Sequence, residues 1–158
     1  MPSYYRRIVR RQRIQLPKLD EREWSVLLSV SDDWENIETI EEQIRRTIGF
    51  AEGEPTYRDW QRAWPTGVKR EEVLRIIERL VIKGLLNAVV EEDSGRWLPA
   101  LDLKAFRMDP DAFWFIAEEN MQNALREIAA GRIPLRRLRE MGGQSIWVSE
   151  VLVSVHKF

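Results

Sequence analysis

A tight turn between two helical stretches constrains the fold of this chain more than any other feature. Apolar residues recur at helical spacing over 56–64 and again over 68–83, and Pro65-Thr66-Gly67 separates the two stretches. Proline does not continue a helix, and Thr66 is placed to cap the helix that follows. The pattern predicts two helices joined by a short turn. The side chains expected to be buried are Trp60 and Trp64 of the first helix and Val73, Ile77 and Leu80 of the second.

A β-hairpin is predicted directly after these helices. Gly84 stands where a left-handed cap at the end of a helix belongs. The β-rich runs 85–91 and 96–101 then flank the turn residues Glu92-Asp93-Ser94-Gly95. We therefore expect a hairpin over about Leu85–Leu101. Of the seven tryptophans of the chain, Trp97 in this hairpin is the one candidate for an exposed position, and the others are expected in the core.

The stretch 73–86 (Val-Leu-Arg-Ile-Ile-Glu-Arg-Leu-Val-Ile-Lys-Gly-Leu-Leu) resembles the recognition-helix end of the winged helix-turn-helix superfamily. In that superfamily a leucine-rich helix closes on Lys-Gly-Leu and enters the wing. The resemblance, to MarR-like and replication-initiator-like winged helices, covers about residues 57–101. It implies a protein that binds double-stranded DNA with its second helix in the major groove. The residues implied to face the groove are Thr66, Lys69, Arg70 and Arg75, while Arg96 on the wing meets the backbone or minor groove.

Charge is strongly segregated along the chain, although the net charge is only -1. Residues 1–18 carry arginine and lysine without one acid, whereas acids far outnumber basic residues over 20–59. Such an arm contacts nucleic acid, lies on the protein's own acidic face, or remains a solvated strand or tail. If it holds nucleic acid, the residues expected to contact phosphates are Arg6, Arg7, Arg10 and Arg11.

Periodicity predicts the remaining elements. The arm over Tyr4–Leu16 is expected to be extended, and Ser145–Phe158 to end as a strand. Further helices are expected from Asp20 or Glu21, over Asn36–Ile48 and from Asp109 or Pro110 to about Ala130. The arginine-rich segment Pro134–Met141 is expected to form a short helix or a turn. The apolar stripe of the long helix, which is either core or the seam of a homodimer, comprises Phe113, Ile116, Ala117, Met121, Ala124, Leu125 and Ile128.

The expected fold class is therefore α+β. A winged helix-turn-helix core carries an N-terminal basic arm or strand and a C-terminal helical extension that ends in a strand. The expected domains are a basic arm over residues 1–19, a winged helix-turn-helix domain over 20–104 and an extension over 105–158. The extension is the candidate dimerisation element.

Acidic residues leave a second function open. Glu71, Glu72 and Glu78 share the outer face of the predicted second helix with Arg75 and Arg79. The predicted wing turn is acidic as well, and both features repel phosphate. The alternative is a winged-helix adaptor that docks a protein partner through its acidic wing and acidic helices.

The sequence carries no recognisable catalytic motif. It lacks a P-loop, Gly-x-Gly-x-x-Gly, His-Glu-x-x-His and Gly-x-Ser-x-Gly, and it has no cysteine and a single histidine, His156. Glu38, Glu41 and Glu42 form either a cation site or a solvated helix face. Because no apolar run is long enough to span a bilayer, we expect a cytoplasmic protein that makes no membrane contact. Because catalytic motifs are missing, we expect no enzymatic activity, and we expect neither a cofactor nor a metal. It would act as a transcriptional regulator or as an accessory factor in replication or partitioning.

Overall fold

The computed structural model describes residues 8–50, 55–91, 97–99 and 102–152, and these form a mixed α+β fold, as expected. The helices are α1 (Glu21–Ser29), α2 (Ile37–Phe50), α3 (Pro55–Ala63), α4 (Arg70–Ile82), α5 (Leu103–Met108), the short 3-10 helix η1 (Pro110–Ala112), α6 (Glu119–Gly131) and α7 (Leu135–Met141). The strands are β1 (Ile8–Gln15), β2 (Leu86–Glu91), β3 (Trp97–Pro99), β4 (Phe113–Ala117) and β5 (Ser145–Leu152).

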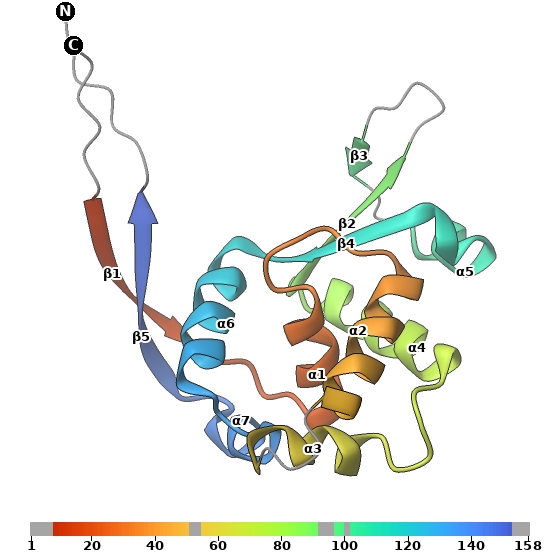
Figure 1. Ribbon diagram of the computed structural model, residues 1–158. Coiled ribbons are helices and arrows are strands. Elements are labelled where there is room, and N and C mark those ends of the chain that lie inside the picture. Colours follow the sequence, from red (N-terminus) through yellow and green to blue (C-terminus); the bar gives the residue numbers. More distant parts are fainter. Residues whose placement is uncertain (1–7, 51–54, 92–96, 100–101, 153–158) are drawn as a thin grey trace, which may run out of the picture.

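The strands form two separate antiparallel sheets. β1 pairs with β5 along its whole length, from Ile8 opposite Leu152 to Gln15 opposite Ser145. The second sheet has the order β3-β2-β4. Figure 1 shows the β1–β5 ribbon at one side of the molecule beside α6, and the sheet of β2, β3 and β4 above α1, α2 and α4 toward the other side.

Local signals start and stop the helices that the sequence predicted. Asp20 caps α1, because its side chain accepts the Glu23 amide at 2.8 Å while the Glu23 carboxylate accepts the Asp20 amide at 3.2 Å. After α4, Gly84 has a φ of 74°. The amide of Gly84 donates to the Val81 carbonyl, and that of Leu85 to the Leu80 carbonyl. These two bonds satisfy carbonyls at the end of the helix and confirm the predicted glycine cap.

The core lies between α1, α2 and α4 and extends to β4 and α6. Val73, Ile77 and Leu80 are fully buried, as the periodicity predicted. The largest fully buried side chains are Trp24, Phe115, Leu16, Leu27, Ile37, Ile40, Ile44, Ile76, Ile77, Leu80, Leu125 and Ile128. Burial of this set removes enough apolar surface from water to hold the three helices together.

The predicted long helix over residues 109–130 is wrong in its first part. Phe113–Ala117 forms β4, and α6 begins only at Glu119, with the Glu118 side chain accepting amides of its first turn. Within β4, burial alternates between neighbouring residues, which places Phe113, Phe115 and Ala117 on the inner face. An apolar run this short fits a strand or a helix equally well, and pairing with β2 decides for the strand.

This correction also changes the interpretation of the apolar stripe. Of its members, Phe113 and Ala117 are buried in β4, and Met121, Ala124, Leu125 and Ile128 are buried on α6. These side chains belong to the core of a single chain, so the stripe gives no support to the predicted homodimer seam. Because β4 pairs with β2, the sheet also joins residues on both sides of the predicted boundary at residue 104. Helix α5 was not predicted.

The predicted hairpin is confirmed in its described part. β2 and β3 pair antiparallel, with Val89 opposite Pro99 and Glu91 opposite Trp97. The predicted turn lies within 92–96, outside the described residues, and the side chain of Trp97 is not described either.

Candidate nucleic-acid interface

Buried tryptophans hold the turn between α3 and α4 against α1. Trp60 and Trp64 are both buried, and the indole N–H of Trp64 donates to the Ser25 hydroxyl at 2.9 Å. The Arg22 side chain donates to the Ala63 carbonyl at 2.6 Å, and its guanidinium lies over the Trp64 ring. These contacts fix the position of the turn relative to α1, and α4 begins directly after it.

The start of α4 differs from the sequence prediction. Gly67 has a φ of 87° and its amide donates to the Trp64 carbonyl, so the chain turns sharply before the helix. The residue that caps α4 is Lys69, in extended conformation and without a side-chain capping bond. Thr66, the predicted cap, lies three residues too early and is exposed. A lysine side chain has no acceptor, so it leaves the first amides of α4 without a side-chain partner.

The predicted groove-facing residues differ in how much the rest of the chain engages them. Lys69 and Arg75 are exposed, and neither makes an ion pair with another residue in the described part of the chain. Arg70 is engaged: it donates to Asp111, and its Nε lies 3.9 Å from Glu41 Oε1. Arg70 therefore links α4 to η1 and α2. Because its charge is already paired within the chain, Arg70 is less available to contact DNA.

Two acids on the outer side of α4 have basic partners from other elements. Glu72 Oε2 lies 2.7 Å from Arg22 of α1, and Glu78 accepts a bond from Arg107 of α5. This bond, together with the negative charge of Glu78, raises the pKa of Arg107 above its ordinary value, so Arg107 remains a cation. Of the three acids on α4, only Glu71 is exposed and makes no ion pair with another described residue. The phosphate repulsion expected from α4 is thus largely cancelled.

The described part of the basic arm does not lie on the acidic stretch of the chain. It forms β1 and pairs with β5, and Gln12 also contacts Asn120 of α6. Arg11 is exposed, and its guanidinium lies 5.9 Å from the centre of the Trp147 ring. Arg10 lies opposite Glu150 in the ribbon. The remaining predicted site residues, Arg6, Arg7 and Arg96, lie outside the described residues.

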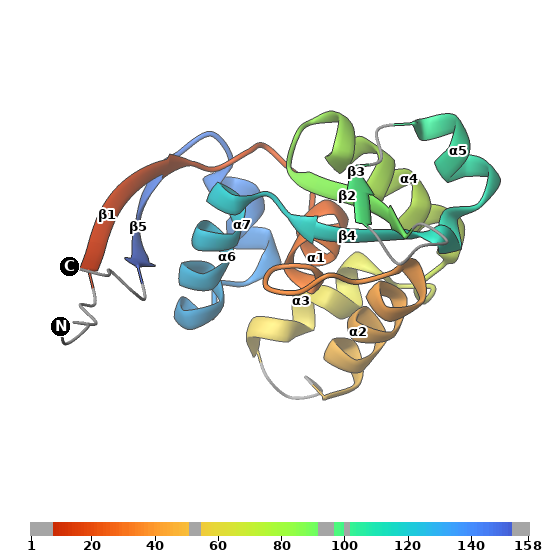
Figure 2. The same ribbon diagram turned by 90° about the horizontal axis from the view of Figure 1, so that it is seen from above.

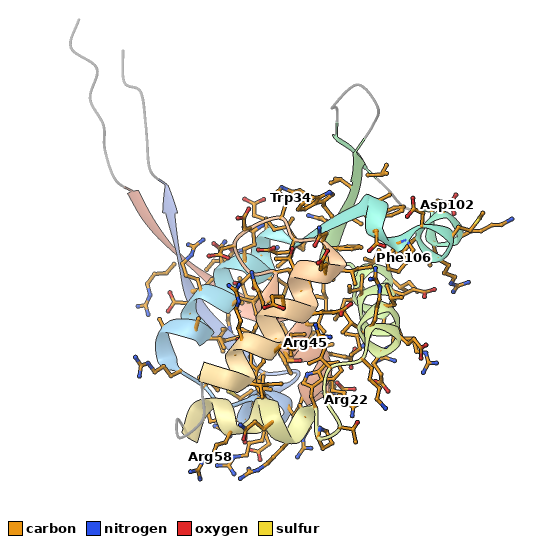
Figure 3. The ribbon with its side chains drawn as sticks, turned by 45° about the vertical axis from the view of Figure 1, so that its right-hand side comes forward. Arg22, Trp34, Arg45, Arg58, Asp102 and Phe106 are labelled. Atoms are coloured by element: carbon orange, nitrogen blue, oxygen red, sulfur yellow. The ribbon has the colours of Figure 1, made fainter. Side chains whose placement is uncertain are left out.

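A group of arginines on α3 and α7 was missed by sequence reasoning. Most of them pair with acids: Arg62 and Arg136 with Asp59, Arg137 with Glu140 and Arg139 with Glu21. Helices α3 and α7 pack together through Asp59, which is buried, pairs with Arg62 at 3.2 Å and accepts the backbone amide of Arg136 at 3.3 Å. Figure 3 shows Arg58 at the outer edge of α3. The exposed arginines on these two helices are Arg58, Arg62, Arg136, Arg137 and Arg139. The arginine content of α7 was visible in the sequence, but its position beside α3 was not.

One acidic loop lies at the opposite end of the molecule from these arginines. Trp34, which is 38% exposed, stands in the loop Asp32–Glu35, far from Arg58 (Figure 3). On α2, Glu41 pairs with Arg45 and Glu42 with Arg46, each one helical turn apart. Glu38 and Glu42 are exposed, as expected for a solvated helix face, whereas Glu41 is only 8% exposed and does not fit that interpretation. No group of acidic or histidine side chains within the described ranges is arranged to hold a metal ion.

Glu35 makes stability depend on pH. Partial burial, followed by the charge of Asp33, raises the pKa of Glu35 above its ordinary value, against the hydrogen bond from Gln43. The folded chain thus binds this proton more tightly than the unfolded chain does, so ionisation of Glu35 costs stability as pH rises through the raised pKa. Glu35→Gln should therefore unfold at a higher temperature than the wild type at pH 7. The difference should vanish below the ordinary glutamate pKa, as measured by thermal melts across pH.

Gln43→Ala provides the complementary test of this assignment. Loss of the amide donor leaves ionised Glu35 less well solvated, so the pH dependence of unfolding should become steeper than in the wild type. Parallel pH profiles for the wild type and Glu35→Gln would show that Glu35 does not carry the effect.

Comparison with known proteins adds no relative. The described helices include none that is long and apolar enough to cross a membrane. No protein-family model, curated protein or solved structure matches this chain.

Proposed function

We propose that this protein binds double-stranded DNA through a winged helix-turn-helix module. In this proposal α3, the turn and α4 form the helix-turn-helix, and β2 and β3 form the wing. The order of elements supports the assignment, as does the glycine cap that leads from α4 into β2. The protein would act by occupying its site, as a transcriptional regulator or as an accessory factor in replication or partitioning.

The observation that carries this proposal is the pairing of the acids on α4. Glu72 is paired with Arg22, and Glu78 with Arg107. The exposed charged side chains of α4 and its cap that could contact DNA therefore include two basic residues, Lys69 and Arg75, and one acid, Glu71. An α-helix fits the major groove, where arginine reads base edges and lysine neutralises phosphate. Thr66 is exposed on the turn and adds a hydroxyl at the same end of α4.

A mobility-shift titration with mixed duplex DNA at two salt concentrations tests the proposal. The wild type should shift duplex DNA at low salt. Lys69→Ala combined with Arg75→Ala should weaken binding and erode preference between sequences, by roughly 1–3 kcal/mol for each side chain that reads a base. The matched control is Arg126→Ala, which removes an exposed arginine from α6 and should leave binding unchanged.

The arm has a different expected effect in the same assay. Alanine at Arg10 and Arg11 should weaken binding to all sequences equally, because phosphate contacts position the protein without reading bases. The salt dependence should flatten by about one unit on a log-log plot for each phosphate that is no longer neutralised.

The second candidate function is a protein-binding adaptor. Trp34, exposed between acidic neighbours, favours a basic peptide as partner, since an aromatic anchor within a charged rim is typical of protein interfaces. The wing acids that the sequence suggested for this role fall outside the described side chains. If micromolar wild-type protein gives no shift at low salt, the DNA proposal fails and the adaptor replaces it.

A further inference from the structure

The outer face of the β1–β5 ribbon gathers basic and aromatic side chains from the two ends of the chain. Ile14 and Val148 are buried on the inner face. Because side chains alternate along a strand, their neighbours Arg13 and Trp147 point to the opposite face, and these two residues lie directly across from each other. The exposed side chains that share this face are Arg11, Arg13, Gln15, Ser145 and Trp147. Figure 2 shows the ribbon beside α6, with its outer side turned away from the helices.

Trp147 is the distinctive residue of this face. Its side chain is 60% exposed, although burial of so large an apolar ring in the core would stabilise the fold. The guanidinium of Arg11 lies 5.9 Å from the ring centre, at the distance of a cation–π contact. This contact and the pairing of β1 with β5 hold the Trp147 ring in place on the outer face of the ribbon. No acidic side chain lies among the described side chains of the face.

We propose that this face binds single-stranded nucleic acid, with Trp147 stacking on an unpaired base and Arg11 and Arg13 contacting the flanking phosphates. An exposed ring accepts the π-face of any base, and adjacent arginines neutralise the backbone. A duplex covers its base faces by stacking, so the ring favours single strands over duplex DNA. The inference does not rest on the proposed role of α4, which lies on the other side of the molecule (Figure 1).

Fluorescence anisotropy with labelled oligothymidylate, oligouridylate and a duplex of equal length tests this proposal. Trp147→Ala should weaken binding to both single strands by about 5- to 150-fold, the loss expected for one base–aromatic stack. Trp147→Phe should retain most of the affinity. The matched control is Trp34→Ala, which removes another exposed tryptophan, in the acidic loop, and should leave binding to single strands unchanged.

The arginines are tested by salt dependence. Arg13→Gln should weaken single-strand binding and lower the slope of log affinity against log salt by about 0.7. Thermal unfolding of each variant verifies that the ribbon is intact. Trp147→Thr, which lacks a ring but introduces a β-branched side chain suited to a strand, should reproduce the loss seen with alanine.

Three results would overturn the proposal. The first is no binding of single strands by micromolar wild-type protein at low salt. The second is an affinity of Trp147→Ala and Trp147→Thr equal to that of the wild type. The third is that Trp147→Ala weakens duplex binding as much as single-strand binding, which would show that the ring does not stack on an unpaired base. The α4 variants should change only duplex binding, so failure of the DNA proposal is distinguishable from failure of this one.

Discussion

Replacing Phe115 with alanine should lower the free energy of unfolding by roughly 3–5 kcal/mol. Phe115 is 1% exposed, and its ring meets that of Phe106 edge to face, with the ring centres 5.6 Å apart. Its backbone also exchanges two hydrogen bonds with Glu35, which links β4 to the loop before α2. Truncation leaves a cavity between these elements, and a rigid core closes such a cavity only in part. Urea denaturation followed by circular dichroism measures the loss.

Ile116→Ala is the matched control for Phe115→Ala. Ile116 is the next residue of β4 and points to the opposite face, where it is only half-buried, so its truncation should cost about 1 kcal/mol. A helix through this segment, as the sequence predicted, would bury Ile116 instead of Phe115. A larger loss for Ile116→Ala than for Phe115→Ala would therefore contradict the strand β4.

Leu80→Ala should cost roughly 2–5 kcal/mol of stability. Leu80 is fully buried on the inner face of α4, in the core shared with α1 and α2. Its carbonyl also accepts the amide of Leu85 in the glycine cap, and this backbone bond survives the substitution. The loss thus measures side-chain packing alone. The denaturation midpoint should fall while the slope of the transition stays constant.

Ile82→Ala, two residues further along α4, is the control for Leu80→Ala. The side chain of Ile82 is 67% exposed, so the change should alter stability by no more than about 0.5 kcal/mol. If both alanine variants lost stability equally, the helical register that buries Leu80 would be wrong.

Much of the fold was predictable because short-range signals encode it. The cap at Asp20, the left-handed glycine at residue 84 and the helical spacing of Ile37, Ile40, Ile44 and Ile48 on α2 each act within a few helical turns. Such signals need no knowledge of the remaining chain, and the structure confirms the elements they predicted. Thr66 is the exception: capping chemistry indicated it, yet the sharp turn at Gly67 delays α4 until Arg70.

The candidate sites were less predictable, because they depend on residues far apart in the chain. Arg70 was indicated for a groove, yet Asp111 engages it from a distant element. Glu72 and Glu78 were expected to repel phosphate, and arginines of α1 and α5 pair with them. The sequence of α4 alone cannot predict these ion pairs, because each partner residue belongs to another helix.

Most of the helices, the caps at Asp20 and Gly84, the hairpin strands and the segregation of charge could be read from the sequence, because these features follow from the chemistry of neighbouring residues. Only the tertiary structure decided that Phe113–Ala117 is a strand, since a short apolar run acquires its conformation from the strand it pairs with. Tertiary structure likewise paired β1 with β5 and so placed Arg13 opposite Trp147. Backbone hydrogen bonds between the two ends of a chain carry no local signature, and register is set by the face that must be buried.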